Sequence, residues 1–280
     1  MHDSTENGDI DESQSGAPAG GYAVRDFFST DEIFRRVAAS AHEEFALPVR
    51  MLFLSGLAAG LSIGLSFLAR ASVTALIPQD SSGLVGNLLY PIGFLLIVLG
   101  RYQLFTENTL TPVTLVLTRI ASIPALLRNW GIVLGANLLG AITLAVLLSV
   151  TNVFNPETAE VAREFARHAI EFSAIDLLFK GIIAGWLVAS MVWLIHAARE
   201  TISRFAIVFV LMYFIPTADL YHCIVGACEV AFLVFEGGTN VIDALFGFFI
   251  PVLIGNTIGG VLLVGILNYA QTKESRFPGY

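Results

Sequence analysis

Six long apolar stretches constrain the fold of this chain more than any other feature of its sequence. Each is long enough to cross the roughly 30 Å hydrocarbon layer of a membrane at a rise of about 1.5 Å per residue. A chain of 280 residues that is 55% hydrophobic and 14% charged, with a mean hydropathy of +0.74, cannot bury that much apolar surface in one soluble core. The sequence therefore predicts an all-α integral membrane protein with six transmembrane helices, near 51–77, 84–118, 130–153, 175–197, 205–235 and 245–270.

The two ends of the chain are polar and are expected outside the membrane. Residues 1–28 carry much of the net charge of −8 among Gly, Ser and Pro, which predicts a disordered acidic tail. Residues 29–46 place apolar side chains at helical spacing after a Ser or Thr cap, which predicts an amphipathic cytoplasmic helix. The membrane domain then spans 47–272, and residues 273–280 form a second cytoplasmic tail.

Positively charged residues indicate the orientation of the spans. Lys and Arg gather before the first span, after the second and fourth spans, and at the end of the chain. Such segments face the cytoplasm, so both termini are expected inside, in a bacterial-type inner (plasma) membrane. Arg163 and Arg167 in the third connection run against this pattern. Because about fifty mostly polar residues precede the first span, that span itself is expected to direct insertion.

The chain also contains an internal duplication. Small residues and an Asn recur in the same order, as Gly56, Gly60 and Asn137 in the first half and Gly181, Gly185 and Asn256 in the second. Ordinary helix packing explains any single Gly pair, but three matches in one order are stronger evidence. Three spans followed by three similar spans must have opposite orientations. The sequence therefore predicts two inverted three-helix repeats, about 50–153 and 175–270.

Two of the six stretches are too long for one plain span, and polar residues interrupt them at 100–109 and 215–223. Irregular backbone at membrane depth is tolerated where it is buried in protein or lines a cavity. We therefore expect broken second and fifth helices whose breaks meet near the midplane and flank a pathway. Two simple kinks, at Pro112 and Pro216, are the alternative.

At these breaks the sequence resembles the formate/nitrite transporter family. The likeness rests on Leu-Phe-Thr at 104–106, on His222 and on the stretch 250–265, and it covers about residues 45–272. The stretch 221–230 most resembles the YfdC-like branch of that family. The resemblance implies six spans with broken second and fifth helices, an aquaporin-like fold, a homopentamer, and transport of small monovalent anions.

The resemblance also carries over pore residues one by one. It implies a loop at the central constriction, with Thr106 near His222. Apolar constrictions would lie on either side of that pair. The loop residues are Leu104, Phe105 and Thr106, and the constriction residues are Tyr90, Phe94, Val188 and Ile215. The family commonly has an acidic residue where Gln103 stands and an Asn where Gly185 stands, so selectivity is expected to differ.

Several ionisable residues stand inside the apolar stretches, where each costs roughly 2.5–3.5 kcal/mol on insertion scales and normally finds a partner. They are Arg101, Glu107, Lys180, Asp219 and Glu229. We expect Lys180 to pair with Glu107 or Glu229 and to add fixed charge that alters the solute preference. A purely structural ion pair, or a Lys180 that reaches the surface, is the alternative.

The predicted chemistry follows from the cost of moving an anion through apolar constrictions. A neutral or transiently neutralised weak acid crosses more easily than a bare ion. Helix N-termini at the breaks attract the anion, and His222 donates a hydrogen bond or a proton, with Thr106 as its hydroxyl partner. A histidine that only packs is the alternative interpretation.

Three functions remain open on the sequence. The first is a channel or transporter for small anions or their conjugate acids, for which the family likeness suggests formate, nitrite, acetate, lactate or hydrosulfide. The second is an aquaporin-like pore for neutral solutes, and the third is a non-conducting membrane scaffold. The sequence lacks an HExxH motif, a phosphate-binding Gly loop and clustered metal ligands, so no enzyme, cofactor or metal is predicted. Its basic residues are too few and scattered for nucleic-acid binding.

Overall fold

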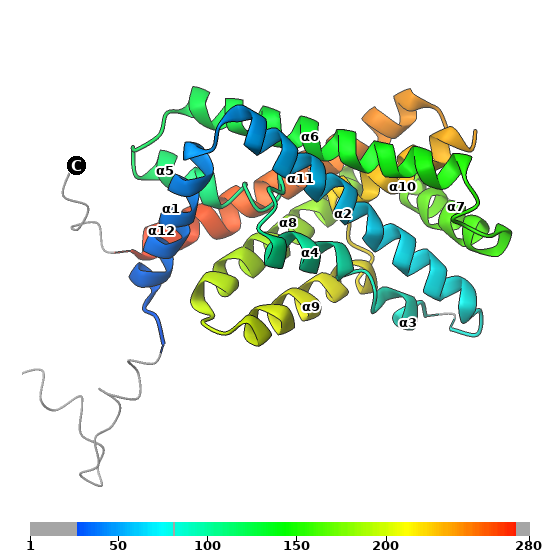
Figure 1. Ribbon diagram of the computed structural model, residues 1–280, viewed down its shortest axis with the longest axis horizontal. Coiled ribbons are helices and arrows are strands. Elements are labelled where there is room, and N and C mark those ends of the chain that lie inside the picture. Colours follow the sequence, from blue (N-terminus) through cyan, green and yellow to red (C-terminus); the bar gives the residue numbers. More distant parts are fainter. Residues whose placement is uncertain (1–26, 81, 273–280) are drawn as a thin grey trace, which may run out of the picture.

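The computed structural model describes residues 27–80 and 82–272, and every regular element in those ranges is a helix (Figure 1). Most of the acidic tail predicted at 1–28, and all of the tail predicted at 273–280, lie outside the described residues. The elements in chain order are α1 (Thr30–Ala46), α2 (Val49–Leu76), α3 (Leu84–Asn87), α4 (Ile92–Gly100), α5 (Thr111–Leu117), α6 (Ile123–Val150), α7 (Pro156–Glu171), α8 (Ala174–Ala197), α9 (Thr201–Thr217), α10 (Cys223–Phe235), η2 (Asp243–Phe249), α11 (Ile250–Ile258), η3 (Gly259–Ile266) and α12 (Leu267–Gln271).

Four of the described helices are long and apolar enough to cross a membrane, judged by length and composition. They are α2, α6, α8 and the continuous helix Asp243–Gln271, which η2, α11, η3 and α12 form together. Three shorter apolar helices span Leu84–Gly100, Thr201–Thr217 and Cys223–Phe235. These shorter helices come from the two stretches that are too long for one span. The prediction of an all-helical protein with membrane-length apolar helices is confirmed.

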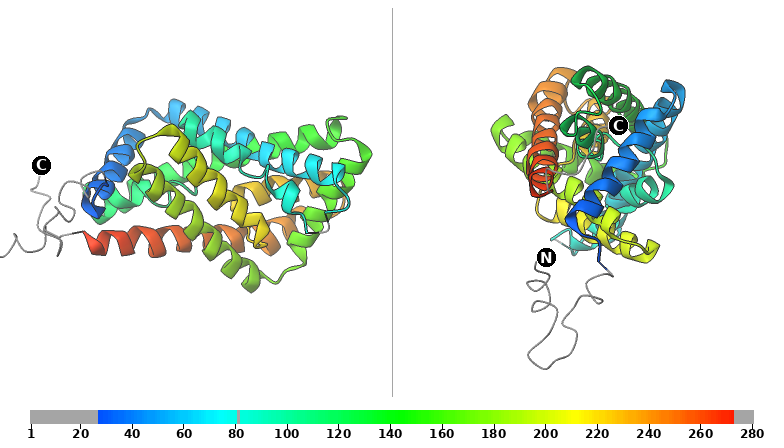
Figure 2. Two further views of the ribbon diagram at one scale, coloured as in Figure 1. Left: turned by 90° about the horizontal axis from the view of Figure 1, so that it is seen from below. Right: turned by 90° about the vertical axis from the view of Figure 1, so that its left-hand side faces the viewer.

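The long helices run roughly along the longest axis of the molecule and pack in matching pairs (Figures 1 and 2). Helix α2 lies against α6, and α8 lies against η2, α11 and η3. A Cβ atom at Gly60 would collide with the backbone of Asn137, and one at Gly185 would collide with the backbone of Asn256. The absence of a side chain therefore lets both pairs of backbones approach closely. Gly56 and Gly181 lie one turn earlier in the same two contacts.

Helices α1 and α7 lie at opposite ends of the molecule (Figures 1 and 2). Helix α1 begins with a capping box, in which the Ser29 hydroxyl accepts from the Glu32 N–H at 3.2 Å and the Glu32 carboxylate accepts from the Ser29 N–H at 2.7 Å. Its apolar face, which includes Phe34 and Val37, packs on α5 and α8.

Sequence reasoning missed α7, which lies between the two predicted repeats. The Asn155 side chain accepts from the Thr158 N–H at 2.8 Å, and Pro156 occupies the first helical position. Asn followed by Pro is a recognised helix start, so the signal was present. The low apolar content of the segment hid it from a search for membrane spans.

Candidate functional site: two helix breaks and the constriction between them

Two helix breaks position the candidate site, and their backbones end in the same way. Helix α4 ends at Gly100 with Arg101 in the left-handed region (φ 58°), and the Tyr102 N–H donates to the Ile97 carbonyl at 3.0 Å. Helix α9 ends at Thr217, Asp219 has φ 53°, and the Leu220 N–H donates to the Ile215 carbonyl at 2.9 Å. These backward bonds close both helices and turn the chain out of helical geometry.

One asparagine then holds each break. The Asn137 side chain accepts from the Phe105 N–H at 2.8 Å and donates to the carbonyls of Gly56 at 2.8 Å and Gln103 at 2.9 Å. The Asn256 side chain makes the corresponding contacts.

Asn256 accepts from the Cys223 N–H at 2.8 Å and donates to the carbonyls of Gly181 at 2.8 Å and Tyr221 at 3.0 Å. Both asparagines are fully buried. Each supplies hydrogen-bond partners that the broken helix itself cannot provide, which is the requirement for irregular backbone away from water.

The breaks bring Thr106 and His222 together inside an apolar enclosure. The Thr106 Oγ1 and His222 Nε2 atoms lie 2.7 Å apart, and both residues are about 1% exposed. The Phe94 ring packs edge-on against the His222 imidazole at 5.0 Å between centroids, and the Tyr90 ring lies 5.7 Å from that of Phe94. A polar pair surrounded by aromatic rings is therefore the centre of the candidate site.

The imidazole of His222 is held in one orientation. As the N-cap of α10, it receives the Val225 N–H on Nδ1 at 3.3 Å. A backbone N–H only donates, so we infer that the neutral ring carries its proton on Nε2 and donates it to the Thr106 hydroxyl. The Thr106 hydroxyl keeps its own proton for another acceptor. The pair can thus offer one O–H donor to a solute oxygen.

The remaining predicted constriction residues are buried in the same apolar core. Leu104, Val188 and Ile215 are completely buried, and Phe105 is 3% exposed. The Phe105 ring packs against Trp130 of α6 at 5.6 Å between centroids. The structure therefore places Tyr90, Phe94 and Thr106 around His222, whereas the Phe105 ring packs against α6.

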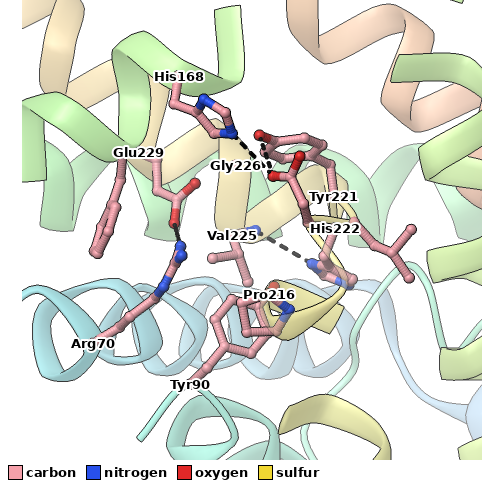
Figure 3. A pocket seen from close by; sticks show the side chains of 12 residues that line it. Arg70, Tyr90, His168, Pro216, Tyr221, His222, Val225, Gly226 and Glu229 are labelled. Atoms are coloured by element: carbon pink, nitrogen blue, oxygen red, sulfur yellow. Dashed lines mark hydrogen bonds and ion pairs between the residues drawn. The ribbon is translucent and has the colours of Figure 1, made fainter. Parts of the chain in front are cut away.

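Two cavities lie beside the breaks, one toward α1 and one toward α7. The cavity near α1 has a volume of roughly 690 Å³, and Arg36, Arg101, Gln103, Glu107 and Arg204 are among its lining residues. The cavity near α7 has a volume of roughly 30 Å³, about the share of one water molecule in the liquid. Figure 3 shows that Arg70, His168, Tyr221, His222 and Glu229 surround it. His222 thus lines the smaller cavity directly.

The pairing predicted for Lys180 is wrong. Its ammonium group donates to the Asp219 carboxylate at 2.7 Å and to the Asp219 carbonyl at 2.8 Å. The left-handed conformation of Asp219 at the end of α9 turns both oxygens toward α8. Glu229 instead faces Arg70, with 3.7 Å between the Arg70 Nη1 and Glu229 Oε1 atoms. Glu107 lines the larger cavity, and its Oε1 has no hydrogen-bond partner among the described residues.

Two positions at which the chain departs from the family pattern have local explanations. Gly185 lies against the Asn256 backbone, where a side chain would collide, so its identity follows from helix packing. Gln103 lines the larger cavity, and its side-chain oxygen accepts from the Asn108 amide at 3.2 Å.

Sequence reasoning also missed Arg70 and His168. Arg70 stands inside the apolar stretch 51–77, and an arginine in such a stretch was a sufficient signal. His168 lies on the unpredicted helix α7, and its Nε2 atom is 3.2 Å from the Asp219 carboxylate. Nothing in the sequence pattern links α7 to the second break.

Comparison with known proteins places this architecture in a class of membrane transport proteins. The family model described as "Formate/nitrite transporter" matches residues 31–270, and the chain belongs to that family. The inner membrane protein YfdC of Escherichia coli (strain K12) is 32% identical over 245 residues, which cover 86% of this chain and 78% of YfdC. The formate channel FocA of Haemophilus influenzae is 25% identical, over 79% of this chain and 86% of FocA. The predicted likeness to YfdC is confirmed.

Two solved structures share the fold. A pentameric formate channel with formate bound has a TM-score of 0.68 and 24% sequence identity, covering 79% of this chain and 96% of that channel. An FNT family ion channel has a TM-score of 0.76 and 20% identity, covering 86% of this chain and 99% of that channel. At these identities the likeness shows the fold alone.

Proposed function

We propose that this protein is a membrane channel for small monovalent anions, such as formate or nitrite, that cross as their conjugate weak acids. The observation that carries this proposal is the hydrogen-bonded pair of Thr106 and His222, enclosed by Phe94 and Tyr90 beside a cavity. Aromatic walls exclude water and disfavour a bare charge, whereas one O–H donor can hold a carboxyl or nitrite oxygen. Membership of the formate/nitrite transporter family and the formate channels among the relatives support the same class of solute.

We further propose six spans arranged as two inverted three-helix repeats with broken second and fifth helices. The four long helices and the two interrupted ones supply six crossings. The matching asparagine bonds of Asn137 and Asn256 support the repeat, because a residue of one half recurs with the same partners in the other. An aquaporin-like path would then run through the place where the two breaks meet.

The surface supports a homopentamer in a bilayer. Large apolar side chains stay exposed along the long helices, for example Leu54, Leu139, Trp186 and Leu262. Such surface needs lipid or a neighbouring subunit to cover it. One of the solved neighbours is pentameric, and one relative is named an inner membrane protein. We propose the same assembly and the same membrane for this chain, with a transport role and no catalysis.

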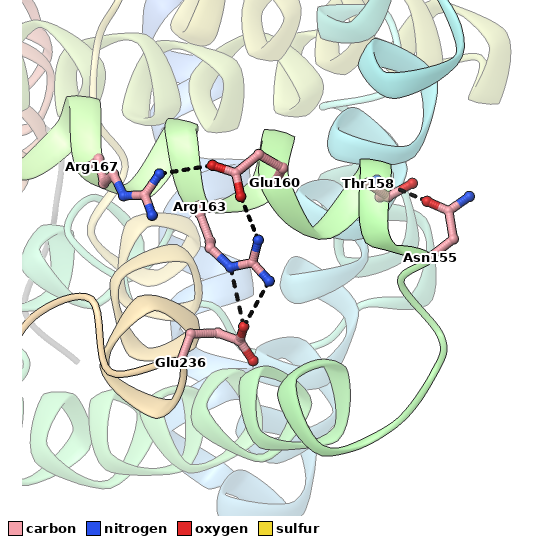
Figure 4. A network of polar contacts seen from close by, with 6 residues as sticks. All are labelled: Asn155, Thr158, Glu160, Arg163, Arg167 and Glu236. Atoms are coloured by element: carbon pink, nitrogen blue, oxygen red, sulfur yellow. Dashed lines mark hydrogen bonds and ion pairs between the residues drawn. The ribbon is translucent and has the colours of Figure 1, made fainter.

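The distribution of Lys and Arg supports the proposed orientation, with both termini in the cytoplasm. Arg163 donates to Glu160 at 2.5 Å and to Glu236 at 3.0 Å, and Arg167 donates to Glu160 at 2.9 Å (Figure 4). Orientation depends on the number of Lys and Arg and little on Asp and Glu. The two arginines of α7 stand against ten Lys and Arg in the segments predicted to face the cytoplasm, so the balance still favours that orientation.

The experiment is flux in liposomes that contain the purified protein, recorded between pH 5 and pH 8. Formate, nitrite, acetate and the neutral solute glycerol would be compared with protein-free liposomes and with the His222→Phe variant. Acid-stimulated anion flux that is lost in the variant supports the weak-acid channel. Formate and nitrite flux that is unaltered in the His222→Phe variant would contradict the proposed role of the histidine. Glycerol flux alone would favour a neutral-solute pore, and no flux of any solute would favour a scaffold.

A further inference from the structure

A carboxyl group in the smaller cavity has no role in the proposed pathway so far. Glu229 is 4% exposed, and its Oε1 atom has no hydrogen-bond partner among the described residues. Arg70 is the nearest cation, but its Nη1 atom lies 3.7 Å away, beyond hydrogen-bond distance. A buried carboxyl with a free oxygen is costly and is rarely retained without a reason.

Arg70 is held in place by other groups. Its Nε–H donates to the Asn87 side chain at 2.9 Å, and its guanidinium lies over the Phe165 ring at 3.9 Å from the centroid. The guanidinium therefore faces the cavity, where Figure 3 shows it joined to Glu229 by the 3.7 Å ion pair. A guanidinium fixed in this way can receive an anion while Glu229 stays beside it.

The position of the pair relative to the constriction gives it a function. Arg70, Glu229, Tyr90 and His222 line the same cavity. A solute that enters from the α7 end would meet Arg70 and Glu229 before it reached the aromatic rings. The His222 Nδ1 atom is occupied by the Val225 N–H, so a second proton on the ring would break the cap of α10. The proton that neutralises the solute is better supplied by a different group.

We propose that Glu229 is that proton donor and that Arg70 holds the anion while it is protonated. The inference rests on the proposed weak-acid function and names the residue that prepares the solute. In the step, the O–H bond of protonated Glu229 breaks and an O–H bond forms on the anion, which leaves a neutral acid and a Glu229 carboxylate. Arg70 then stabilises the carboxylate, and solvent water from the α7 end returns the proton to it. No oxidant or further reactant is involved.

Other titratable and charged groups face this cavity, and they do not replace Glu229. Asp219, the second carboxylate, is held by Lys180, His168 and the Tyr221 hydroxyl, the last at 3.1 Å. Tyr90 and His222 belong to the constriction. Cys228 lies next to Glu229 on α10 and is a buried free thiol. Glu229 is thus the carboxyl of this cavity that keeps an unoccupied acceptor.

The test compares Glu229→Gln, Glu229→Asp and the wild type in liposomes that carry an entrapped pH dye. Formate uptake and proton entry are measured together, with protein-free liposomes as background. We expect Glu229→Gln to lower protein-dependent formate uptake at pH 7 by at least about tenfold and to remove the proton entry that accompanies it. Glu229→Asp, which retains a carboxyl group, should recover part of both. Glu236→Gln breaks an ion pair at the same end of the molecule and should leave both unchanged.

A purely structural ion pair makes a different prediction. The double variant Arg70→Met/Glu229→Leu replaces the pair with apolar side chains, which buried pairs often tolerate without loss of stability. If that variant, or Glu229→Gln, keeps the formate flux and the proton entry of the wild type, the inference is overturned. A wild-type protein that transports no formate at all would instead overturn the proposed function. The two failures are therefore distinguishable.

Discussion

The two helix breaks share a backbone arrangement and differ in the side chains that they present. Each begins with a left-handed residue, closes with the same backward hydrogen bond, and is held by one asparagine. The equivalent bonds of Asn137 and Asn256 align Leu104 with His222 and Thr106 with Ile224. The first break thus supplies a hydroxyl and the second an imidazole. A repeated scaffold has been kept while its chemistry has diverged.

The left-handed residues at which the two breaks begin carry opposite charges. Arg101 opens the first break and pairs with Glu43 of α1 at 2.7 Å. Asp219 opens the second and pairs with Lys180 of α8 and His168 of α7. Each break is therefore held by a helix at its own end of the molecule. The cavity toward α1 is also much larger than the one toward α7. The two ends of the molecule therefore present different charges and different cavity volumes to a solute.

The largest expected effect tests whether the two scaffolds are equivalent in energy. Asn137→Leu and Asn256→Leu each remove three hydrogen bonds, so three buried backbone groups lose their partner. Each group left unpaired costs roughly 1–3 kcal/mol, so both variants should lose about 3–9 kcal/mol of unfolding free energy. Unfolding in mixed micelles measures this loss. Asn152→Leu, at an exposed position, is the control. A large loss of unfolding free energy at only one asparagine would show that the two breaks are not equivalent in energy.

A second prediction concerns the chemistry that differs between the breaks. Thr106→Val removes the hydroxyl and leaves the His222 Nε2–H without its acceptor. We expect formate flux to fall about tenfold, which corresponds to about 1.4 kcal/mol in the barrier. Thr106→Ser should restore most of it. Ile224→Val is the matched control, because Ile224 occupies the aligned position in the second break and is fully buried without a polar group. Equal losses in both variants would assign the effect to packing.

The sequence predicted the scaffold better than the charges. Apolar stretches, the repeated Asn and Gly residues, and the polar interruptions depend on local pattern, so they located the apolar helices and the breaks, whereas the family resemblance pointed to His222. The partner of Lys180 depends on how Asp219 is turned at the end of α9, which no spacing reveals. Arg70 was visible in an apolar stretch, but its partnership with Glu229 joins α2 to α10 across the fold. Contacts between distant elements were the part that sequence could not supply.

A third prediction follows from the contact of α1 with the first break. The Thr111 hydroxyl donates to the Glu44 carboxylate at 2.7 Å, and burial raises the pKa of Glu44 to about 7 from its ordinary 4.5. A carboxyl whose pKa is raised in the folded state stabilises docking below the ordinary pKa, and that stability is lost as the pH rises from about 4.5 through about 7. We therefore expect α1 to be held more firmly at pH 5 than at pH 8.

Hydrogen exchange of the α1 amides measures this docking, after correction for the intrinsic effect of pH. Exchange should be several-fold faster at pH 8 than at pH 5 in the wild type. Glu44→Gln keeps an acceptor for Thr111 but cannot ionise, so it should remove the difference. The amides of α7, at the opposite end, serve as the internal reference. An α1 whose corrected exchange does not change with pH would show that Glu44 does not control the docking.

The smallest expected effect concerns the left-handed residues that open the breaks. Glycine adopts positive φ without the penalty of roughly 1–2 kcal/mol that other residues incur, although it loses about 0.5–1 kcal/mol through the greater freedom of the unfolded chain. The side chains of Arg101 and Glu43 are 77% and 69% exposed, so their ion pair adds little. Arg101→Gly should therefore be neutral or stabilising by up to about 1 kcal/mol.

Asp219→Gly relieves the same backbone strain but removes a carboxylate that Lys180, His168 and Tyr221 share. The Lys180 side chain is only 23% exposed, so its ammonium would lose its carboxylate partner in a partly buried place. We expect Asp219→Gly to be destabilising by about 1 kcal/mol in the same unfolding measurement. Changes of opposite sign in the unfolding free energy would show that folding does not need the charge of Arg101 but does need that of Asp219. Equal changes in unfolding free energy would mean that Arg101 and Asp219 differ only in the sign of their charge.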